Sequence, residues 1–512
     1  MAVHAFIGGP IHTMDAGPQA EVVVTDGHRI VAVGERALLA AYPDATVRDL
    51  AGRTLAPGFI DAHNHLSIAA LHPRWRDVSA VADRDTLVDA IRSQAATEPD
   101  ATWVRCRDWN DASTAFTPTR HDLDAAGLDR PVVVAHYSLH QAVVSSAALD
   151  ALGIGRDAPD PPAGEIGRGP GGEPSGLLVE RAWSDAHAAS LRAYTDPERW
   201  ADHIVARAGV LLANGITAVH DAACAPDAER VYQALAKARR LPVSVVMMPH
   251  SAALLSNDAQ GRLGGPLTGE GDEQCRVGAI KLFADGGVAI ALDTAINGTR
   301  LRYGIVMEDL ASRARDAIGR GFDLAVHAIG NVGVERAIDA FADARSTRGA
   351  ECRLRLEHAG VTSADQWTRL AALEAFAVVQ PGFVEHVATQ SGGVRFDDHH
   401  WLAFAGLAEA GVELAGSSDD PCAPVSPLWC AQRGVTRMTE RGLLFERDQS
   451  VPFADWLRAY TIGAARAGRQ ECERGSLTPG KRADLVVLDL AAPDGGRIDE
   501  TWVAGEQVYA RV

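Results

Sequence analysis

From about residue 200 onward, short apolar runs alternate regularly with amphipathic segments. The amphipathic segments, for example 228–239 and 310–320, have the three- and four-residue spacing of helices. Most of the apolar runs are continuous, which is typical of strands that are buried on both faces. These runs lie at 215–220, 243–248, 277–283, 322–327, 353–358, 376–380 and 412–417.

This repetition of strand and helix predicts the α/β class with parallel strands. Counting Thr54 to Ala62 as the first strand gives eight strands, which favours a (β/α)8 barrel of the TIM type over residues 55–474. In such barrels the reactive groups lie at the carboxyl ends of the strands.

Both ends of the chain have a different sequence pattern, in which short runs of β-forming residues alternate with tight turns. Asp26-Gly27 separates two such runs and indicates a hairpin. Near the C-terminus, 481–488 and 501–509 have the same pattern. Because isolated hairpins are marginally stable in water, we expect residues 1–54 and 475–512 to pack together as one small β-sandwich domain.

The stretch at 67–195 interrupts the pattern directly after the first predicted strand. A helix is predicted at 86–98, and residues 159–176 are rich in Gly and Pro, which predicts a loop. Long insertions in compact domains are often functional. We interpret 67–195 as an insertion over the mouth of the barrel that carries substrate contacts.

Composition and charge narrow the class of protein. The net charge of -18 disfavours nucleic acid or an anionic membrane as a partner. Seven cysteines without a Cys-x-x-Cys pair are typical of reduced thiols in the cytosol. The sequence has neither a signal-peptide pattern nor an apolar run long enough to span a membrane. These features favour a cytoplasmic protein with a small-molecule substrate; a homodimer remains open.

Residues that can bind metal ions stand at the ends of several predicted strands. Each of these residues could instead have a purely structural role, since a single lysine often only reaches solvent and a single aspartate often caps a turn. Their coincidence at one rim of the predicted barrel nevertheless indicates a metal site. They are His63 and His65 after the first strand, Lys281 in the fourth, His327 at the end of the fifth, His358 at the end of the sixth and Asp419 after the eighth.

Five motifs in this order resemble those of the amidohydrolase superfamily of metal-dependent hydrolases, in particular its YtcJ-like branch, amidohydrolase family 3. They are PGFIDAHNH, KLFADGG, VHAIGN, LEHAG and GSSDDP. The resemblance implies that His63, His65 and Asp419 bind one divalent ion, with zinc expected, and that His327 and His358 bind a second. Lys281, carboxylated on its side-chain nitrogen, would bridge the two ions.

The same resemblance implies hydrolysis of a non-peptide carbon–nitrogen bond, for example in an N-acyl or N-formyl amine, by a metal-activated hydroxide. Asp419 would take the proton and pass it to the leaving group. Adjacent Asp420 is a rival for that role. Asp285 is either a partner of the site or a turn residue.

Other candidates and functions stay open. His140, Trp109 and Tyr303 are candidate substrate contacts, and His220-Asp221 has no assigned role. An ester or lactone hydrolase, a hydrolytic deaminase and a metal-free scaffold are the alternatives. Deamination is disfavoured because no carboxylate follows His327 until Glu335.

Overall fold

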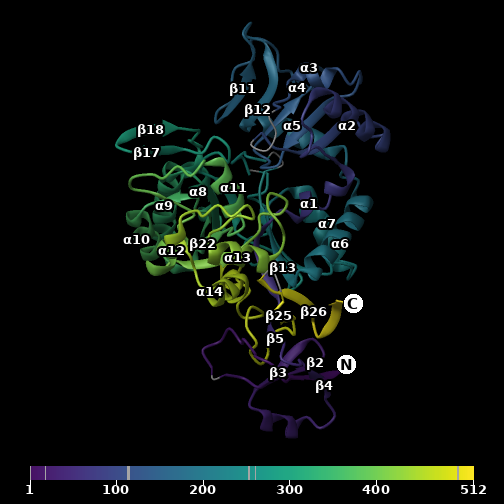
Figure 1. Ribbon diagram of the computed structural model, residues 1–512, viewed down its shortest axis with the longest axis vertical. Helices are drawn as coiled ribbons and strands as arrows, with labels where there is room; N and C mark the ends of the chain where they lie inside the picture. Colours follow the sequence, from purple (N-terminus) through teal and green to yellow (C-terminus); the bar gives the residue numbers. More distant parts are fainter. Residues whose placement is uncertain are drawn as a thin grey trace.

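The computed structural model describes residues 2–17, 19–111, 116–251, 254–259, 261–492 and 495–511. Three parts follow one another along the long axis of the molecule (Figure 1). Strands β7–β12 with helices α2–α5 lie at one end, the α/β body lies in the middle, and the small β region with both termini lies at the other end.

The α/β body is built on eight parallel strands that follow chain order. The strands are β6 (Phe59–Asn64), β13 (Ile216–Cys224), β14 (Ser244–Pro249), β16 (Ile280–Phe283), β19 (Leu324–Ala328), β20 (Leu354–His358), β22 (Phe376–Val379) and β24 (Glu413–Gly416). They form a sheet of order β15-β14-β13-β6, which includes the short strand β15 (Cys275–Val277), and a sheet of order β16-β19-β20-β22-β24. In addition, β14 contacts β16 and β24 contacts β6.

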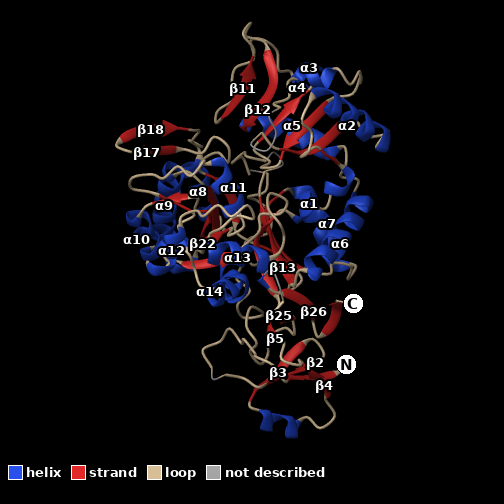
Figure 2. Cartoon of the chain, in the orientation of Figure 1, coloured by secondary structure: helices blue, strands red, loops and turns tan. Residues whose placement is uncertain are grey.

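Helices pack around these strands (Figure 2). The predicted helices at 228–239 and 310–320 correspond to α7 (Pro226–Lys237) and α8 (Leu310–Gly319). Each buries one face, which includes Tyr232 in α7 and Ala314 in α8. The helices of the body include α6 (Pro197–Ala213), α7 (Pro226–Lys237), α8 (Leu310–Gly319), α9 (Asn331–Arg348), α10 (Ala364–Ala372), α11 (Phe383–Gln390), α12 (Phe404–Glu409), α13 (Pro427–Thr436) and α14 (Phe453–Arg458).

The first predicted strand, Thr54 to Ala62, is two strands in the structure. β5 (Thr54–Pro57) pairs antiparallel with β25 (Leu485–Asp489), and the barrel-type strand β6 begins only at Phe59. The chain changes sheet at Gly58, where a Cβ atom would lie 2.4 Å from Thr217 Oγ1. A residue without a side chain therefore permits the close crossing that the hydrophobic pattern did not reveal.

The two chain ends form two four-stranded sheets that share buried side chains. One sheet has the order β3-β2-β1-β4 and the other β27-β26-β25-β5. Phe6 and Val23 of the first sheet pack with Leu55, Val487 and Trp502 of the second. The remaining strands are β1 (Val3–Ile7), β2 (Val22–Asp26), β3 (Arg29–Gly34), β4 (Thr46–Asp49), β26 (Arg497–Val503) and β27 (Glu506–Ala510).

Deletion of residues 481–512 should destabilise the N-terminal sheet as well as remove the C-terminal one. It strips β5 of its partner strand and uncovers Phe6, and each large apolar side chain that loses its burial costs about 1.5–3 kcal/mol. We expect the melting temperature to fall by several degrees in calorimetry, whereas deletion of 511–512 alone should have little effect. An unchanged melting temperature would show that the two ends are independent.

The insertion contains a six-stranded sheet of order β11-β12-β10-β9-β8-β7, with α2 (Arg84–Thr97) close to the predicted helix. The prediction of a loop at 159–176 is wrong for 164–168 and 174–176, where β11 and β12 form a hairpin. Pairing of β12 with β10 extends the sheet, and Gly172 (φ +81°) supplies the turn. The elements are β7 (Arg76–Asp77), β8 (Val104–Trp109), β9 (Val132–His136), β10 (Gln141–Val144), β11 (Gly164–Arg168), β12 (Pro174–Glu180), α3 (Arg120–Asp124), α4 (Ser146–Leu152) and α5 (Arg181–Arg192).

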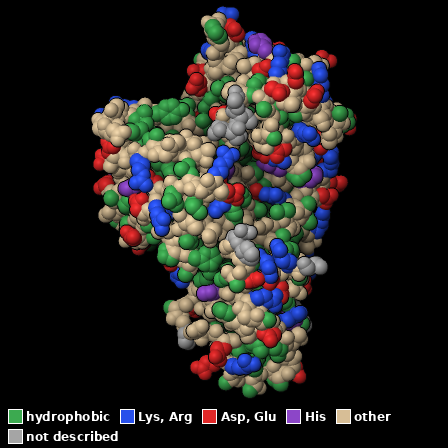
Figure 3. Space-filling model, viewed as in Figure 1, with side chains coloured by type: hydrophobic (Ala, Val, Ile, Leu, Met, Phe, Trp, Pro, Cys, Tyr) green, Lys and Arg blue, Asp and Glu red, His purple; other side chains and the backbone are tan. Residues whose placement is uncertain are grey.

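Acidic and basic side chains are interspersed over the face shown in Figure 3. Across the described ranges, no helix combines the length and the apolar character that crossing a membrane requires.

Candidate metal centre

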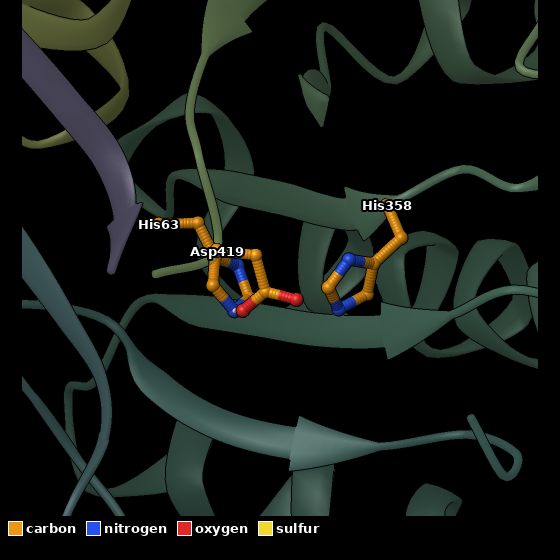
Figure 4. Close-up of side chains that lie close together, drawn as sticks. All are labelled: His63, His358 and Asp419. Atoms are coloured by element: carbon orange, nitrogen blue, oxygen red, sulfur yellow. Dashed lines mark ion pairs between the residues drawn. The ribbon is translucent and has the colours of Figure 1, made fainter. Parts of the chain in front are cut away.

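Three predicted ligands meet at the carboxyl ends of the body strands (Figure 4). His63 lies near the end of β6, His358 at the end of β20, and Asp419 in the segment after β24. All three are buried, and one potential ligand atom from each lies within 4.8 Å of the others. The backbone is left-handed at His358 (φ 76°) and Asp419 (φ 61°), a strain that proteins tend to concentrate at functional sites.

His65 joins this group from the residue directly after β6. Its Nε2 lies 3.0 Å from Asp419 Oδ1, and His63 Nε2 lies 3.4 Å from the same oxygen. His65 Nδ1 is 2.7 Å from the carbonyl oxygen of Ala222 and donates to it, which leaves the lone pair of Nε2 facing the centre.

Lys281 and His327 complete the set of predicted ligands. Both are buried, and burial lowers the pKa of Lys281 to about 8. Among the described residues, no carboxylate lies within ion-pair distance of the Lys281 ammonium. The six predicted ligands all line one small cavity of about 30 Å³. A cavity volume of about 10–15 Å³ holds one water molecule. This cavity therefore has room for about two species the size of an ion or a water molecule.

Several ligand atoms are buried without a hydrogen bond. Within the part of the chain that the structure describes, His63 Nε2, His327 Nε2 and Asp419 Oδ1 have no hydrogen-bond partner. Buried polar atoms are normally satisfied. Imidazole nitrogens and a carboxylate oxygen are donors that zinc and similar ions accept, so these residues fit a divalent metal ion.

Orienting partners of these ligands were missed by the sequence reasoning. His63 Nδ1 lies 2.6 Å from Glu357 Oε2, and Glu357 accepts in turn from Arg355. His358 Nδ1 lies 2.9 Å from Oε1 of Gln380, which follows β22. Such partners fix the orientation of ligand imidazoles. Arg355 and Glu357 alternate within the buried strand β20, and buried charges of this kind require partners, which is the signal that could have identified them.

Electrostatics favour the metal-binding forms of His63, His358 and Asp419. Burial, together with Lys281, lowers the pKa of His63 to about 4. Burial and the neighbouring His63 lower the pKa of His358 to about 3. Burial alone would raise the pKa of Asp419, but His63 and His65 outweigh it and hold that pKa below its ordinary value. At neutral pH the centre therefore offers neutral imidazoles at His63 and His358 and an ionised carboxylate at Asp419, while the hydrogen bond and charge of Asp419 outweigh burial and raise the pKa of His65.

Two other aspartates of the motifs, Asp285 and Asp420, face other partners. Asp420 is paired with Arg207 on α6, so its carboxylate is engaged away from the ligand cluster. Asp285 accepts the backbone N–H groups of Ala291, Ile329 and Gly330 and lies 3.8 Å from His327 Nε2. It organises the loops around His327 without a hydrogen bond to that ring.

A larger cavity of about 520 Å³ adjoins the ligand cluster, between the insertion and the body. His140 lines it, whereas the other two predicted substrate contacts do not. Trp109 ends β8 and packs in the core of the insertion, and Tyr303 lies 56% exposed on β18 (Thr299–Tyr303) of an outer hairpin. The side chains of Trp109 and Tyr303 do not line the cavity because of how their strands pack in the tertiary structure, which the sequence pattern does not reveal. His220 is buried beside Arg355 and Gln470, away from this cavity.

A buried cluster of metal-ligand side chains at the strand ends of an α/β fold is the arrangement expected of a metal-dependent hydrolase. The family model described as "Amidohydrolase family" matches residues 46–509. The N-substituted formamide deformylase of Arthrobacter pascens is 32% identical over 94% of this chain and 92% of its own length. YtcJ of Bacillus subtilis (strain 168) is 29% identical over 98% of this chain and 99% of its own length.

The fold has a close counterpart among solved structures. An uncharacterized metal-dependent hydrolase from Pyrococcus horikoshii OT3 superimposes with a TM-score of 0.75 at 22% identity, covering 97% of this chain and all of its own. The chain belongs to the amidohydrolase family. It is a metal-dependent hydrolase that acts on carbon–nitrogen bonds.

Proposed function

We propose that this chain hydrolyses neutral N-substituted formamides and closely related N-acyl amines. The observation that carries the proposal is the convergence of six ligand-type side chains on one small cavity beside a larger, substrate-sized one. The similarity to an N-substituted formamide deformylase over most of both chains supports this choice of bond.

His63, His65 and Asp419 would bind one divalent ion, with zinc as the proposed metal, and His327 and His358 a second. Lys281 would bridge them after carboxylation, since an ammonium has no lone pair and a carbamate offers oxygen ligands. Its buried amine has a pKa of about 8, which provides neutral amine near physiological pH for reaction with carbon dioxide. When bound, divalent ions polarise a carbonyl and make water nucleophilic at neutral pH.

The lining of the larger cavity favours a neutral substrate. Phe383, Val387, Trp401 and Leu402 provide apolar wall. Among the described residues that line this cavity there is no Lys or Arg. An N-acyl amino acid would bring a carboxylate into the cavity without a cationic partner, and burying an unpaired charge is costly. A formamide with an apolar N-substituent meets no such cost.

Asp419 is the proposed proton carrier. Its Oδ1 faces the ligand cluster without a hydrogen bond, whereas Asp420 is held by Arg207. An ionised carboxylate at this position can accept a proton from the nucleophile and return it to the departing nitrogen. Orientation of His63 by Glu357 and of His358 by Gln380 keeps the neighbouring ligands in place for this transfer.

Hydrolytic deamination is the alternative reaction within the same fold, but this chain has no carboxylate shortly after His327 to support it. Glu335, the first acidic residue after His327, lies on α9 and accepts from Arg369 of α10 at 2.6 Å. This ion pair holds the carboxylate among the outer helices.

The architecture is part of the proposal. We propose that the eight parallel strands close into one (β/α)8 barrel, because backbone hydrogen bonds join Asp419 N to His63 O (2.8 Å) and His65 N to Asp420 O (2.9 Å) across the β24–β6 junction. The barrel would comprise 55–474, with 67–195 as an inserted mouth region, beside a β-sandwich domain of 1–54 and 475–512. Seven free cysteines fit a cytoplasmic location.

Replacement of Lys281 by alanine should lower kcat/KM for an N-alkyl formamide by about 100-fold or more, because a bridging ligand is lost. Added short carboxylic acids should restore part of the activity by occupying the vacated space. Lys237→Ala, on the outer helix α7, is the matched control and should keep full activity.

Steady-state kinetics with and without acetate measure this effect, and intact-mass analysis under mild conditions should show one added carboxylate that Lys281→Ala lacks. Full activity in Lys281→Ala would exclude the bridge.

A further inference from the structure

A histidine and a glutamate of the insertion form a pair beside the metal centre that the ligand set does not use. His140 lies in the loop between β9 and β10, and Glu180 is the last residue of β12. His140 Nδ1 is 2.6 Å from Glu180 Oε2, and the Glu180 side chain is fully buried.

The body of the enzyme is shaped to receive this pair. Glu180 Oε1 accepts the backbone N–H groups of Val288 and Ala289, each at 2.9 Å. A Cβ atom at Gly286 would lie 2.5 Å from Glu180 Oε1, and one at Gly287 would lie 2.4 Å from the His140 ring. The Gly-Gly sequence of the KLFADGG motif therefore permits an approach that any side chain would block.

These contacts determine the tautomer of His140. Burial raises the pKa of Glu180, but His140 and the two backbone N–H groups outweigh burial and lower it, so the carboxylate is ionised. An ionised carboxylate only accepts hydrogen bonds, so the proton lies on His140 Nδ1. The Gly287 N–H also lies 3.0 Å from His140 Nδ1. The contact of Nδ1 with the Glu180 carboxylate is shorter, at 2.6 Å, and therefore decides where the proton lies. When the ring carries only this proton, Nε2 is a hydrogen-bond acceptor on the side away from Glu180.

His140 stands where the two cavities meet. Its ring centroid is 5.2 Å from that of His327. The described residues that line both cavities are Ser138, His140, His327, His358, Asp419 and Cys422. Three of these are proposed metal ligands, and Ser138 Oγ lies 2.7 Å from His136 Nδ1. His140 thus contributes a ring nitrogen that neither the ligand set nor a neighbouring side chain uses.

We propose that Nε2 of His140 accepts the N–H of the substrate amide, so that the enzyme selects secondary over tertiary formamides. The inference rests on the proposed function. A secondary formamide carries one N–H on the nitrogen that will leave, and this hydrogen bond orients that nitrogen while the carbonyl faces the metal centre. A tertiary formamide has no N–H, and it would leave the buried acceptor unpaired.

The test compares an N-alkyl formamide with its N-methyl-N-alkyl counterpart in wild type, His140→Phe and His203→Phe, all loaded with zinc. His140→Phe keeps a ring and removes the acceptor, and His203, on α6 outside both cavities, is the control. Wild type should prefer the secondary substrate. His140→Phe should lose about tenfold or more in kcat/KM on the secondary formamide and less than about threefold on the tertiary one. Its bound zinc should match that of wild type and His203→Phe.

Equal losses on both substrates, or a lower zinc content in His140→Phe, would overturn the inference, since His140 would then serve the fold or the metal. A wild type that hydrolyses both formamides equally well would overturn it without any variant, which covers the case that His140→Phe fails to fold. A zinc-loaded wild type that hydrolyses neither would instead overturn the proposed function, and the inference with it.

Discussion

Removal of the metal by a strong chelator should reduce hydrolysis of an N-alkyl formamide at least about 1,000-fold. The reason is that the polarised carbonyl and the activated water together represent several kcal/mol of transition-state stabilisation. The six predicted ligands line the small cavity of about 30 Å³ that would hold the metal. Activity should return on addition of zinc or a similar divalent ion.

Formate release, followed before and after dialysis against chelator, measures the loss. The control is circular dichroism of the metal-free protein, which should show that the fold persists, since the strands that carry the ligands are held by buried apolar contacts. Full activity in protein shown by elemental analysis to be metal-free would contradict a metal-dependent hydrolysis.

Asp419→Asn should lower kcat by about 10²- to 10⁴-fold while the protein stays folded, because proton transfer by a positioned group is worth about this much. Asparagine preserves the shape and can still offer an oxygen, but it cannot take up the proton. The acidic limb of the pH–rate profile should disappear with the carboxylate. An amide should suffer more than an ester, because nitrogen leaves poorly without a returned proton.

The measurement uses a matched formamide and formate ester with wild type, Asp419→Asn and Asp420→Asn. Asp420 is the natural comparison, since its carboxylate is paired with Arg207. Equal losses on amide and ester would show that Asp419 does not protonate the leaving group. If Asp420→Asn loses its hydrolytic activity and Asp419→Asn keeps it, the catalytic base is Asp420 and not Asp419.

Much of the α/β body could be predicted because its strands are buried on both faces. Such strands appear in a sequence as largely apolar runs, and each run predicted after residue 200 overlaps a strand of the structure. The insertion was harder to interpret. Its hairpin β11–β12 is rich in Gly and Pro, and it is a strand pair only because β10 provides a third strand beside it.

The clustering of the proposed metal ligands could be predicted because most of them stand at or next to the carboxyl end of a strand, where the fold itself determines position. Their orienting partners could not, since Glu357 and Gln380 are recognised only by the atoms they face. The substrate contacts depended most on tertiary structure. His140 lines the cavity because its loop is held by Glu180, whereas Trp109 and Tyr303, chosen from similar segments, point elsewhere.

Zinc titration of the metal-free protein, compared between wild type and the double variant His63→Ala/His358→Ala, is the most direct test of the proposed metal centre. Both residues lie in the same buried group as Asp419. Since His63 is a proposed ligand of the first ion and His358 of the second, the double variant removes one ligand from each. Between one and two equivalents bound tightly by wild type, and clearly fewer by the double variant, is the predicted result. No zinc uptake by wild type, or the same uptake by both proteins, would contradict the assignment of these residues as the metal centre.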